Sequence, residues 1–524
     1  NEFYVNQGDG SFVELGESLG VALDSTVDSR AAVWGDINND GWADLYVGNR
    51  ATPDRLFLNL EGEGFEEIAF AAGIIQLGHP KAVNMADLNN DGFLDIYVSN
   101  FLLENFLYLN NGDNTFTNFT ISSNALDNGL AMGTVIFDYD KDGDMDIYLV
   151  HDGFEPNFLY QNNGNAQFID VAPEVGAATE SFGMGVDIGD VNNDGWLDIY
   201  IANLGSNYLL LNNGDGTYSN IYQEAAVGDI GMGWGTSLLD YDKDGLVDIY
   251  VANDYAFSPY RNVLYQNTGD LTFQVAEEPN PISNQYRSYG SACLDYNMDG
   301  NMDLLVTNKG PNQRSQLFRN ANRPHAWIGF KLIGVESNKS AVGAKVRIVD
   351  DLGVLHYDEV IAGSSWSSQS SLLLHFGLGD ATAIDTLTIT WPSGLEQTLA
   401  IEHLDTYYTV EEGGEAREGV GTSITTSTTT IPADTPPLRV FPNPTAGPFT
   451  VEFFAPSNKP TQVEILDQLG RRLYNQQIDS PQLDKNTLVV ELAGTLSTIS
   501  AQLLLVKVQT GAIIATRKIW IQSR

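Results

Sequence analysis

Short apolar runs bounded by turn-forming residues recur through the first part of the chain. Residues 45–47 (Leu-Tyr-Val) and 96–98 (Ile-Tyr-Val) are typical. Runs of this length that are rich in β-branched and aromatic residues predict buried strands. A second run follows each of them, such as residues 56–59 (Leu-Phe-Leu-Asn), and Asn-Gly-Asp-Gly at residues 213–216 predicts a hairpin turn. Each repeat is therefore expected to form two hairpins, and the predicted fold class is all-β.

An acidic loop of nine residues precedes each of the first runs. In residues 36–44, oxygen-bearing side chains occupy positions 1, 3, 5 and 9, and Gly occupies position 6. Ca²⁺ takes about six to eight oxygen ligands from carboxylates, amides, backbone carbonyls and water. Positions 1, 3, 5 and 9 can supply side chains and position 7 its carbonyl, while Gly permits the sharp turn.

The same loop occurs six times, so we predict about six Ca²⁺ sites. The predicted ligands, with position 7 acting through its backbone, are Asp36, Asn38, Asp40, Trp42, Asp44; Asp87, Asn89, Asp91, Phe93, Asp95; Asp138, Asp140, Asp142, Asp144, Asp146; Asp190, Asn192, Asp194, Trp196, Asp198; Asp240, Asp242, Asp244, Leu246, Asp248; and Asp295, Asn297, Asp299, Asn301, Asp303.

Two other interpretations of these acidic loops are less satisfactory. An EF-hand needs a bidentate Glu at position 12 and flanking helices, whereas position 12 here is apolar, as at Val47 and Leu149. Asn, Asp and Gly are also common in ordinary turns, but a turn does not require the further carboxylates. The loops are therefore expected to join two strands around a metal ion.

The spacing of the loops indicates a β-propeller or a solenoid. Their first residues are 50 to 55 positions apart, and strand repeats of this period are typical of propeller blades. The second run occurs seven times, which predicts seven blades, with six as the alternative count and a further calcium loop expected upstream of Asn1. Gly133 and Gly185, in the strands that enter the loops, suit close backbone approach near a propeller axis.

Residues 1–324 resemble the FG-GAP/VCBS repeats of integrin-α-like propellers, in which blades carry DxDxDGxxD calcium loops. The resemblance rests on the six acidic loops and the blade-length period. It implies that calcium stabilises the blades and that the ligand is bound elsewhere on the propeller.

Residues 325–412 change character and predict a small all-β domain. Strand-like runs such as 327–333 and 386–391 are separated by Gly, Ser and Asp. Residues 375–379 (His-Phe-Gly-Leu-Gly) and 391–394 (Trp-Pro-Ser-Gly) resemble the ASPIC/UnbV domain of the cartilage acidic protein family. The run at 363–371, rich in Ser, predicts an exposed polar loop.

The C-terminal part divides into a linker and a further β domain. Residues 413–437 are rich in Ser, Thr and Pro and cannot bury a core. Residues 438–524 resemble the C-terminal sorting domain of bacterial type IX secretion cargo, which implies an immunoglobulin-like sandwich. One departure is Ala-Gln-Leu at residues 501–503, where that family commonly has Gly-x-Tyr.

The net charge of the chain limits the classes of partner that it is expected to bind. Asp and Glu number 69 against 26 Lys and Arg, a formal charge of −43, which argues against nucleic acid or anionic membranes as partners. No run reaches membrane-spanning length, so no membrane insertion is expected.

The single cysteine, Cys293, predicts a buried inert thiol. Calcium loops and a sorting domain together predict a secreted bacterial protein, extracellular or at the cell surface.

These observations favour a non-catalytic, calcium-stabilised surface protein for adhesion or structural assembly, with self-assembly into a sheath or filament as a variant. The expected partners are other surface proteins, glycans or copies of the same chain. A lectin is the alternative, with Trp42, Phe93 and Trp196 stacking on sugars. A polysaccharide-active enzyme is the third possibility, but the scattered histidines offer no catalytic constellation.

Overall fold

The computed structural model describes residues 1–153, 155–276, 281–310, 313–320, 324–420, 439–441, 449–454, 461–466, 472–478, 485–490, 502–510 and 513–521. The chain divides into two compact units, residues 1–421 and 422–524. The predicted linker at 413–437 falls largely on residues 421–437, and these, like Ala501, lie outside the described residues.

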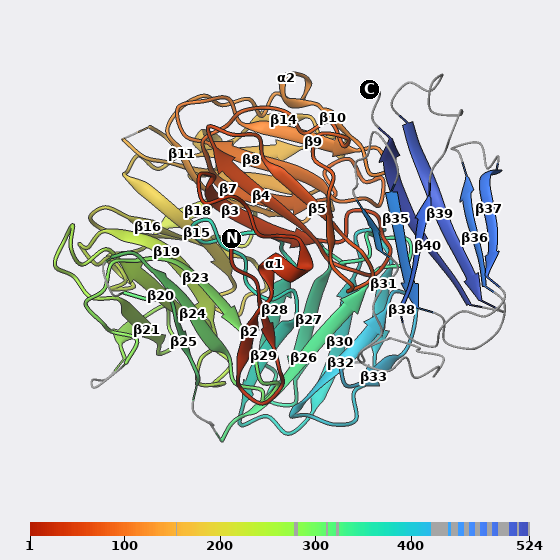
Figure 1. Cartoon of the computed structure of the whole chain (residues 1–524). Coiled ribbons are helices and arrows are strands. Elements are labelled where there is room, and N and C mark those ends of the chain that lie inside the picture. Colours follow the sequence, from red (N-terminus) through yellow and green to blue (C-terminus); the bar gives the residue numbers. More distant parts are fainter. Residues whose placement is uncertain are drawn as a thin grey trace. The chain divides into compact units, whose positions relative to one another are not determined.

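Five four-stranded antiparallel sheets follow one another along the first unit, as the colours from red to green in Figure 1 show. Their strands are β3 (Asp28–Gly35), β4 (Asp44–Arg50), β5 (Arg55–Asn59), β6 (Phe65–Glu67); β7 (Pro80–Ala86), β8 (Asp95–Asn100), β9 (Phe106–Asn110), β10 (Phe116–Asn118); β11 (Ala131–Phe137), β12 (Asp146–His151), β13 (Phe158–Asn162), β14 (Phe168–Asp170); β15 (Gly183–Gly189), β16 (Asp198–Asn203), β17 (Tyr208–Asn212), β18 (Tyr218–Asn220); and β19 (Gly233–Leu239), β20 (Asp248–Asn253), β21 (Val263–Asn267), β22 (Phe273–Val275). The all-β fold is confirmed.

Two smaller sheets complete the series among the described residues. One is β23 (Ser288–Leu294), β24 (Asp303–Asn308) and β25 (Gln316–Phe318), and the other is the hairpin β1 (Tyr4–Asn6) and β2 (Phe12–Glu14). The side chain of Asn6 donates to the carbonyl of Tyr296 at 2.7 Å, which places the hairpin beside the sheet of β23. One-turn helices α1 (Gly16–Leu19), α2 (Thr120–Ser123) and α3 (Ala172–Val175) follow β2, β10 and β14.

The first strand of each four-stranded sheet is its innermost, and these strands pack closely side by side. Every residue of β11 and β15 is buried. A Cβ added to Gly133 would lie 2.5 Å from the carbonyl oxygen of Met184, and one added to Gly185 would lie 2.2 Å from that of Trp234. The prediction that glycine permits close backbone approach here is therefore confirmed.

The middle domain contains two four-stranded sheets. One has the order β29-β26-β32-β33 and the other β28-β27-β30-β31, and β26 pairs with β32 in parallel. The strands are β26 (Ala326–Ile333), β27 (Lys345–Asp350), β28 (Leu355–Glu359), β29 (Leu374–Gly379), β30 (Ile384–Thr390), β31 (Glu396–Leu399), β32 (Thr406–Glu411) and β33 (Ala416–Glu418). One hydrophobic core contains buried residues of both this domain and the first sheets, including Val342 and Met145, so the two regions form one unit.

The run predicted as an exposed polar loop is instead buried at residues 363–365 and half-buried at residues 366–371, among the inner strands. We call residues 362–371 the axial segment. Ser365 is 1% exposed; it exchanges backbone hydrogen bonds with Val186 of β15 and its hydroxyl accepts the N–H of Thr236 of β19. Met85 of β7 donates to the carbonyl of Ala362. The prediction was wrong because these small polar residues lie between several sheets. There they form hydrogen bonds with backbone groups of the inner strands, which would otherwise have no partner.

The axial segment also joins the first sheet to the last. The N–H of Trp34 in β3 donates to the side-chain oxygen of Gln369 at 2.7 Å, and the amide of Gln369 donates back to the carbonyl of Trp34 at 3.1 Å. On the other side, the N–H of Ser371 donates to the carbonyl of Cys293 in β23. A segment of the middle domain therefore connects β3 with β23.

The described residues of the second unit form two antiparallel sheets. They are β34-β35-β38 and β37-β36-β39-β40, with the bounds β34 (Arg439–Phe441), β35 (Phe449–Phe454), β36 (Thr461–Leu466), β37 (Arg472–Ile478), β38 (Lys485–Val490), β39 (Gln502–Thr510) and β40 (Ile513–Ile521). The immunoglobulin-like sandwich itself stays a prediction. No helix among the described residues of the chain is long and apolar enough to span a bilayer.

Candidate functional site: the acidic loops

Each of the six acidic loops joins the innermost strand of a sheet to the second strand, and all share one backbone turn. Position 4 has a left-handed φ in every loop, for example 58° at Asn39 and 62° at Lys141. Position 6 is always a glycine with positive φ, such as 92° at Gly41. The sequence signalled the glycine, and Asn at position 4 is a residue that tolerates this conformation.

The carboxylates at positions 1 and 9 are fixed by backbone N–H groups. Asp36 accepts the N–H of Asp40 and of Gly41 at 3.1 and 2.6 Å. Asp44 accepts the N–H of Ile37 on one oxygen and of Asn59 on the other, at 3.0 and 2.7 Å. The lone pairs of these oxygens that accept no hydrogen bond are thereby fixed in position within the loop. They can coordinate a cation there.

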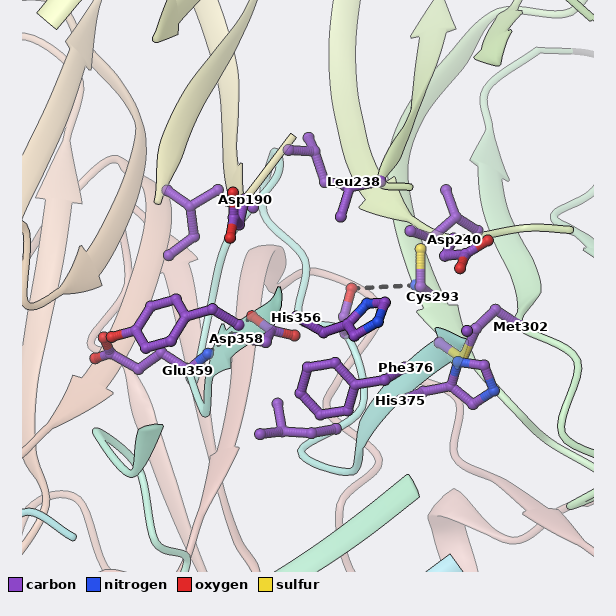
Figure 2. Close-up of a pocket in the computed structure, with 18 of the residues that line it drawn as sticks. Asp190, Leu238, Asp240, Cys293, Met302, His356, Asp358, Glu359, His375 and Phe376 are labelled. Atoms are coloured by element: carbon purple, nitrogen blue, oxygen red, sulfur yellow. Dashed lines mark hydrogen bonds between the residues drawn. The ribbon is translucent and has the colours of Figure 1, made fainter. Parts of the chain in front are cut away.

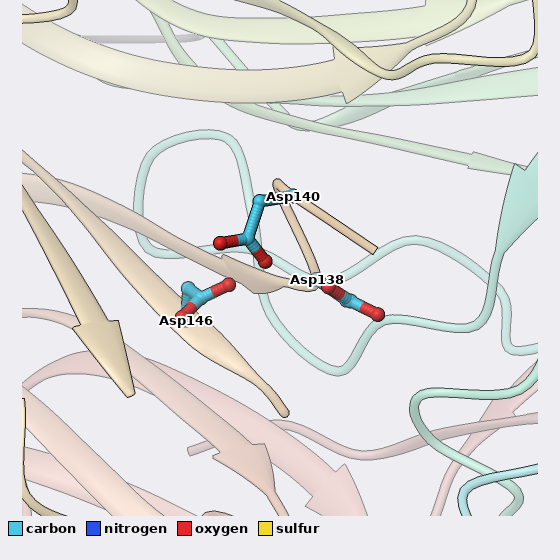
Figure 3. A group of neighbouring side chains, drawn as sticks. All are labelled: Asp138, Asp140 and Asp146. Atoms are coloured by element: carbon cyan, nitrogen blue, oxygen red, sulfur yellow. The ribbon is translucent and has the colours of Figure 1, made fainter. Parts of the chain in front are cut away.

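Two loops bring three carboxylates together. In the third loop, one oxygen each of Asp138, Asp140 and Asp146 lies within 4.8 Å of the others (Figure 3). The fifth loop does the same with Asp240 and its neighbours Asp242 and Asp244. These are the loops with Asp rather than Asn at position 3, and the acidic groups in them could hold a metal ion.

Burial makes the charged form of these groups costly in the absence of an ion. It raises the pKa of the Asp44 and Asp190 carboxyls to about 7 and that of Asp87 to about 6. The position-9 residues Asp95 and Asp198, both fully buried, have pKa values raised well above the usual range, again mainly through burial. A bound divalent cation would reverse this effect, because it stabilises the ionised carboxylates.

Sequence reasoning missed a set of asparagines that connect the sheets. The side chain of Asn110, at the end of β9, donates to the carbonyl of Leu94 in its own loop and of Ile37 in the preceding loop, at 3.0 and 2.7 Å. Asn162 makes the equivalent pair with Met145 and Leu88. The signal was present as the Asn that ends the second run of each repeat.

Position 4 makes a second connection between successive loops. The side chain of Asn39 donates to the carbonyl of Gly92 in the next loop at 2.9 Å, and Asn193 donates to that of Gly245 at 2.9 Å. These contacts join neighbouring loops directly, so the geometry of one loop constrains the next.

The middle domain contacts the acidic loops through charged and polar groups. Lys345 Nζ lies 2.8 Å from Asp138 Oδ2, and the hydroxyl of Tyr407 donates to Asp295 Oδ2 at 2.9 Å. The hydroxyl of Ser340 accepts the N–H of Asp36. The acidic loops therefore form part of the interface between the sheets and the middle domain, within the first unit.

The rings at position 7, suggested as sugar platforms, lie against the hairpin turn of their own sheet. A Cβ added to Gly62 would lie 3.0 Å from the ring of Trp42, and one added to Gly112 would lie 3.1 Å from Phe93. Lys141 Nζ lies 4.1 Å from the centroid of Trp196. These contacts give the rings a packing role.

A cavity of about 130 Å³ lies where the middle domain meets the fourth to sixth sheets (Figure 2). Its lining includes Asp358, His375 and Cys293. Burial raises the pKa of the Cys293 thiol to about 12 and lowers that of His375 to about 4, so at neutral pH both are uncharged. The predicted burial of Cys293 is confirmed. The cavity is smaller than the roughly 300–1,000 Å³ typical of small-molecule sites.

Comparison with protein families agrees with this architecture. The FG-GAP-like repeat matches six overlapping segments, residues 1–47, 36–98, 87–149, 138–201, 190–251 and 240–306. The family described as ASPIC and UnbV matches residues 334–425. A secretion system C-terminal sorting domain matches residues 439–522, which places the protein outside the cell or at the cell surface through type IX secretion.

The curated relatives are cartilage acidic proteins. Cartilage acidic protein 1 of Homo sapiens is 30% identical over 163 residues, 29% of this chain and 24% of the relative. That of Xenopus tropicalis is 23% identical over 404 residues, 68% of this chain and 60% of the relative. The chain therefore spans less than two thirds of the length of either relative.

Among solved structures, a lectin of Agrocybe aegerita that recognises non-reducing terminal N-acetylglucosamine aligns with a TM-score of 0.40 and 17% identity, over 60% of this chain and 87% of the lectin. A structural similarity of this size does not identify a ligand of this chain. The repeat match, by contrast, covers more than half of the chain and coincides with the six acidic loops and their sheets. The chain belongs to the FG-GAP-like repeat family.

Proposed function

We propose that the six acidic loops bind Ca²⁺ through the side chains at positions 1, 3, 5 and 9 and the carbonyl at position 7. The observation that carries this proposal is the position-9 carboxylate. In all six loops it is buried and accepts only backbone N–H groups among the described hydrogen bonds, as Asp44 and Asp95 show. A buried carboxylate without a counter-charge is unfavourable, and a cation bound in the loop supplies that charge.

The donor set favours Ca²⁺ over other metals. It consists of carboxylate, amide and carbonyl oxygens, whereas Zn²⁺ is usually held by Cys and His. Mg²⁺ needs near-ideal octahedral geometry and keeps several waters. A loop of nine residues with a carbonyl and several carboxylates suits the larger and more flexible coordination shell of Ca²⁺.

The protein then acts as a non-catalytic, calcium-stabilised surface protein in adhesion or structural assembly. Its partners are other surface proteins, glycans or further copies of the chain. Two observations support a structural role for the metal. The loops are hydrogen-bonded to their neighbours around the series of sheets, and the middle domain covers them through contacts such as that of Lys345 with Asp138.

Counting bound metal tests the proposal. Protein stripped with a chelator and dialysed against calcium should bind about six Ca²⁺ per chain by elemental analysis, and titration calorimetry should show the same stoichiometry. Asp95→Asn should lower the count by one. The control is Asp113→Asn, an aspartate in an exposed hairpin turn that accepts hydrogen bonds from Thr115. A chain that binds no Ca²⁺, or that loses none with Asp95→Asn, would contradict the proposal.

A further inference from the structure

The six acidic loops fall into two classes. The first, second, fourth and sixth loops have Asn at position 3, whereas the third and fifth have Asp. The residue before the asparagine that ends the second run differs in the same way. It is Gln161 or Gln266 in the two repeats with Asp, and Leu58, Leu109, Leu211 or Arg319 in the four with Asn. Position 3 of the loop and this residue of the second run therefore vary together.

In the four Asn loops, the position-3 amide is a partner for the position-5 carboxylate. In the first loop, Asn38 Nδ2 donates to Asp40 Oδ2 at 3.0 Å, and the N–H of Trp42 donates to Asp40 Oδ1 at 2.8 Å. The equivalent amide bonds of the second, fourth and sixth loops measure 2.9, 2.9 and 2.8 Å. Both oxygens of the position-5 carboxylate thus have donors within the loop, which reduces the cost of leaving these loops without a cation.

The two Asp loops lack this amide bond, because an ionised aspartate at position 3 has no proton to donate. Instead, the aspartates at positions 1 and 3 and a third aspartate of the same loop each bring one oxygen within 4.8 Å of the others, as Figure 3 shows for the third loop. Like charges at such a distance repel one another, and a bound cation removes that repulsion.

The fifth loop also leaves carboxylate oxygens without partners. Asp240 is 9% exposed, and both Asp240 Oδ1 and Asp242 Oδ1 are buried with no hydrogen-bond partner among the described residues. In the other five loops, the same oxygen of the position-1 aspartate accepts the position-5 N–H at 3.0 to 3.1 Å. A buried carboxylate oxygen without a donor is unfavourable, so a cation in the fifth loop supplies an interaction that the protein does not.

Gln161 and Gln266 hold the position-3 carboxylates of the Asp loops. Gln161 Nε2 donates to Asp140 Oδ2 at 2.6 Å, and Gln266 Nε2 donates to Asp242 Oδ2 at 2.8 Å. Each bond fixes one carboxylate oxygen from outside the loop and leaves the other available to a metal ion. Groups that orient metal ligands in this way contribute to metal affinity, whereas the leucines of the Asn loops have no group to donate.

Cations lie beside both classes of loop, so they do not remove the difference between them. The third loop has four aspartates at ligand side-chain positions, one more than each Asn loop. Lys345 Nζ lies 2.8 Å from Asp138 Oδ2, but this ammonium group also compensates the buried Glu359. Among the Asn loops, the sixth has a cation of its own, because Arg319 lies 3.1 Å from Asp299.

The cations near the fifth loop are also shared with acids outside it. Lys243, at position 4, interacts with Asp240 but also with Asp405 and with two aspartates of the sixth loop. His325 interacts with the position-5 aspartate and lies 3.4 Å from the exposed Asp380. The fifth loop, like the third, therefore keeps the larger set of acidic ligands.

We propose that the third and fifth loops are the two tight calcium sites of the chain, filled before the other four, and that Gln161 and Gln266 are positioning residues for them. The Ca²⁺ affinity of oxygen-ligand sites depends on the number of charged ligands and on the rigidity of the site, and both are greater in these two loops. The inference rests on the calcium binding proposed above and adds an order of filling. At calcium concentrations between the two affinities, the chain carries metal in the third and fifth loops, while internal hydrogen bonds satisfy position 5 of the Asn loops.

Competition of the metal-free chain with a chelator of known affinity sorts the sites by strength. We expect two Ca²⁺ to bind at least about tenfold more tightly than the other four. Asp140→Asn should convert the third loop to the weaker class, leaving one tight site in a total of six. Gln161→Leu should weaken the third loop about tenfold without changing the melting temperature at saturating calcium, a readout that a merely structural role would move. In the Asp140→Asn background, Gln161→Leu should have no further effect on affinity, because the pair then matches that of the Asn loops.

The converse change can be made in the first loop. Asn38→Asp combined with Leu58→Gln should raise the number of tight sites from two to three. The matched control is Gln167→Leu, an exposed glutamine in the hairpin of the third sheet, which should leave every site unchanged.

Six sites of equal affinity overturn the inference. So does a Gln161→Leu chain that melts lower at saturating calcium while its two tight sites keep their affinity, and so does a first-loop double variant that still has two tight sites. Six bound Ca²⁺ without two classes contradict this inference alone, whereas absence of bound Ca²⁺ contradicts the calcium proposal.

Discussion

Lys345 Nζ lies 2.8 Å from Asp138 Oδ2, so a lysine of the middle domain reaches a carboxylate at position 1 of the third acidic loop. Burial alone would lower the pKa of this lysine, but Glu359 and Asp138 outweigh that effect and raise it. The ammonium group is therefore charged at neutral pH and partly compensates two buried acids. Lys345 and Glu359 of the middle domain and Asp138 of the third loop therefore form one group of interacting charges.

Replacing Lys345 by Met is expected to destabilise the chain more without calcium than with it. Removing one partner of a buried ion pair typically costs about 3–5 kcal/mol. Calcium in the third loop would compensate Asp138 and reduce that loss. Urea unfolding of the variant with chelator and with excess calcium measures the difference, and Lys331→Met on β26 is the control. Equal destabilisation in the two conditions would argue against a metal at Asp138.

Removing calcium is expected to lower the melting temperature of the first unit by more than about 10 °C. A ligand that binds only the folded state adds about 2.7 kcal/mol per site when its free concentration is 100 times its dissociation constant. Several sites in one cooperative unit add together. Differential scanning calorimetry with a chelator and with millimolar calcium tests this, and magnesium at the same concentration should restore little of the loss. An unchanged melting temperature would show that the loops do not hold the fold together.

The stability of the metal-free chain is expected to fall as pH rises from 5 to 8. The pKa of Asp87 is raised to about 6 and those of Asp44 and Asp190 to about 7 by burial, above the roughly 3.9 of an unfolded chain. A group with a raised folded-state pKa stabilises the fold at low pH, and that stabilisation is lost as pH passes through the folded value. Calcium requires ionised carboxylates, so the stabilisation it adds should grow over the same range.

Denaturant midpoints at pH 5, 6.5 and 8, with and without calcium, give both trends. A metal-free chain that becomes more stable toward pH 8 would contradict the assignment of buried carboxyls to the loops. Asp113→Asn, in an exposed hairpin turn, serves as the control and should leave both trends unchanged.

Much of the first unit could be predicted because its signals are local. The acidic loops, the apolar strands beside them and the glycines of the inner strands each lie within a few residues of one another, and turn geometry alone explains Gly41 and its equivalents. The close packing of Gly185 was expected from the crowding of strands near a propeller axis, whereas its partner, the carbonyl of Trp234, was not predicted.

The remaining features depend on contacts between distant parts of the chain. The axial segment resembles a surface loop in composition, and only its distant partners, such as Val186 for Ser365, reveal that it is buried. The asparagines that end several of the second runs act on the preceding repeat, as Asn110 does on Ile37 and Asn162 does on Leu88. Composition and spacing do not encode such pairings, because they depend on how the sheets are placed in space.

Gly185→Ala is expected to destabilise the chain by several kcal/mol, because a Cβ there would lie 2.2 Å from the carbonyl oxygen of Trp234 in the neighbouring inner strand. The contact is with backbone, so relief requires the sheets to move apart, and overpacking of this kind typically costs about 1–3 kcal/mol or more. Gly414→Ala is the control, since that glycine has no positive φ and an added Cβ would lie 3.1 Å from its nearest neighbour, the carbonyl oxygen of Glu411. Equal unfolding midpoints for the two variants would show that the inner strands are not closely packed.

Gln369→Ala tests whether the axial segment stabilises the first unit. Its side chain accepts the N–H of Trp34 and donates to the carbonyl of the same residue, so the variant leaves both backbone groups of β3 without these partners. Each unsatisfied buried group costs about 1–3 kcal/mol, and the calcium-loaded chain should unfold at a lower denaturant concentration. Gln223→Ala, which removes an exposed glutamine bonded to the hydroxyl of Tyr222, should leave the midpoint unchanged. If the two variants behave alike, the connection that Gln369 makes between β3 and the middle domain contributes no stability, and the first sheet is held by its other contacts.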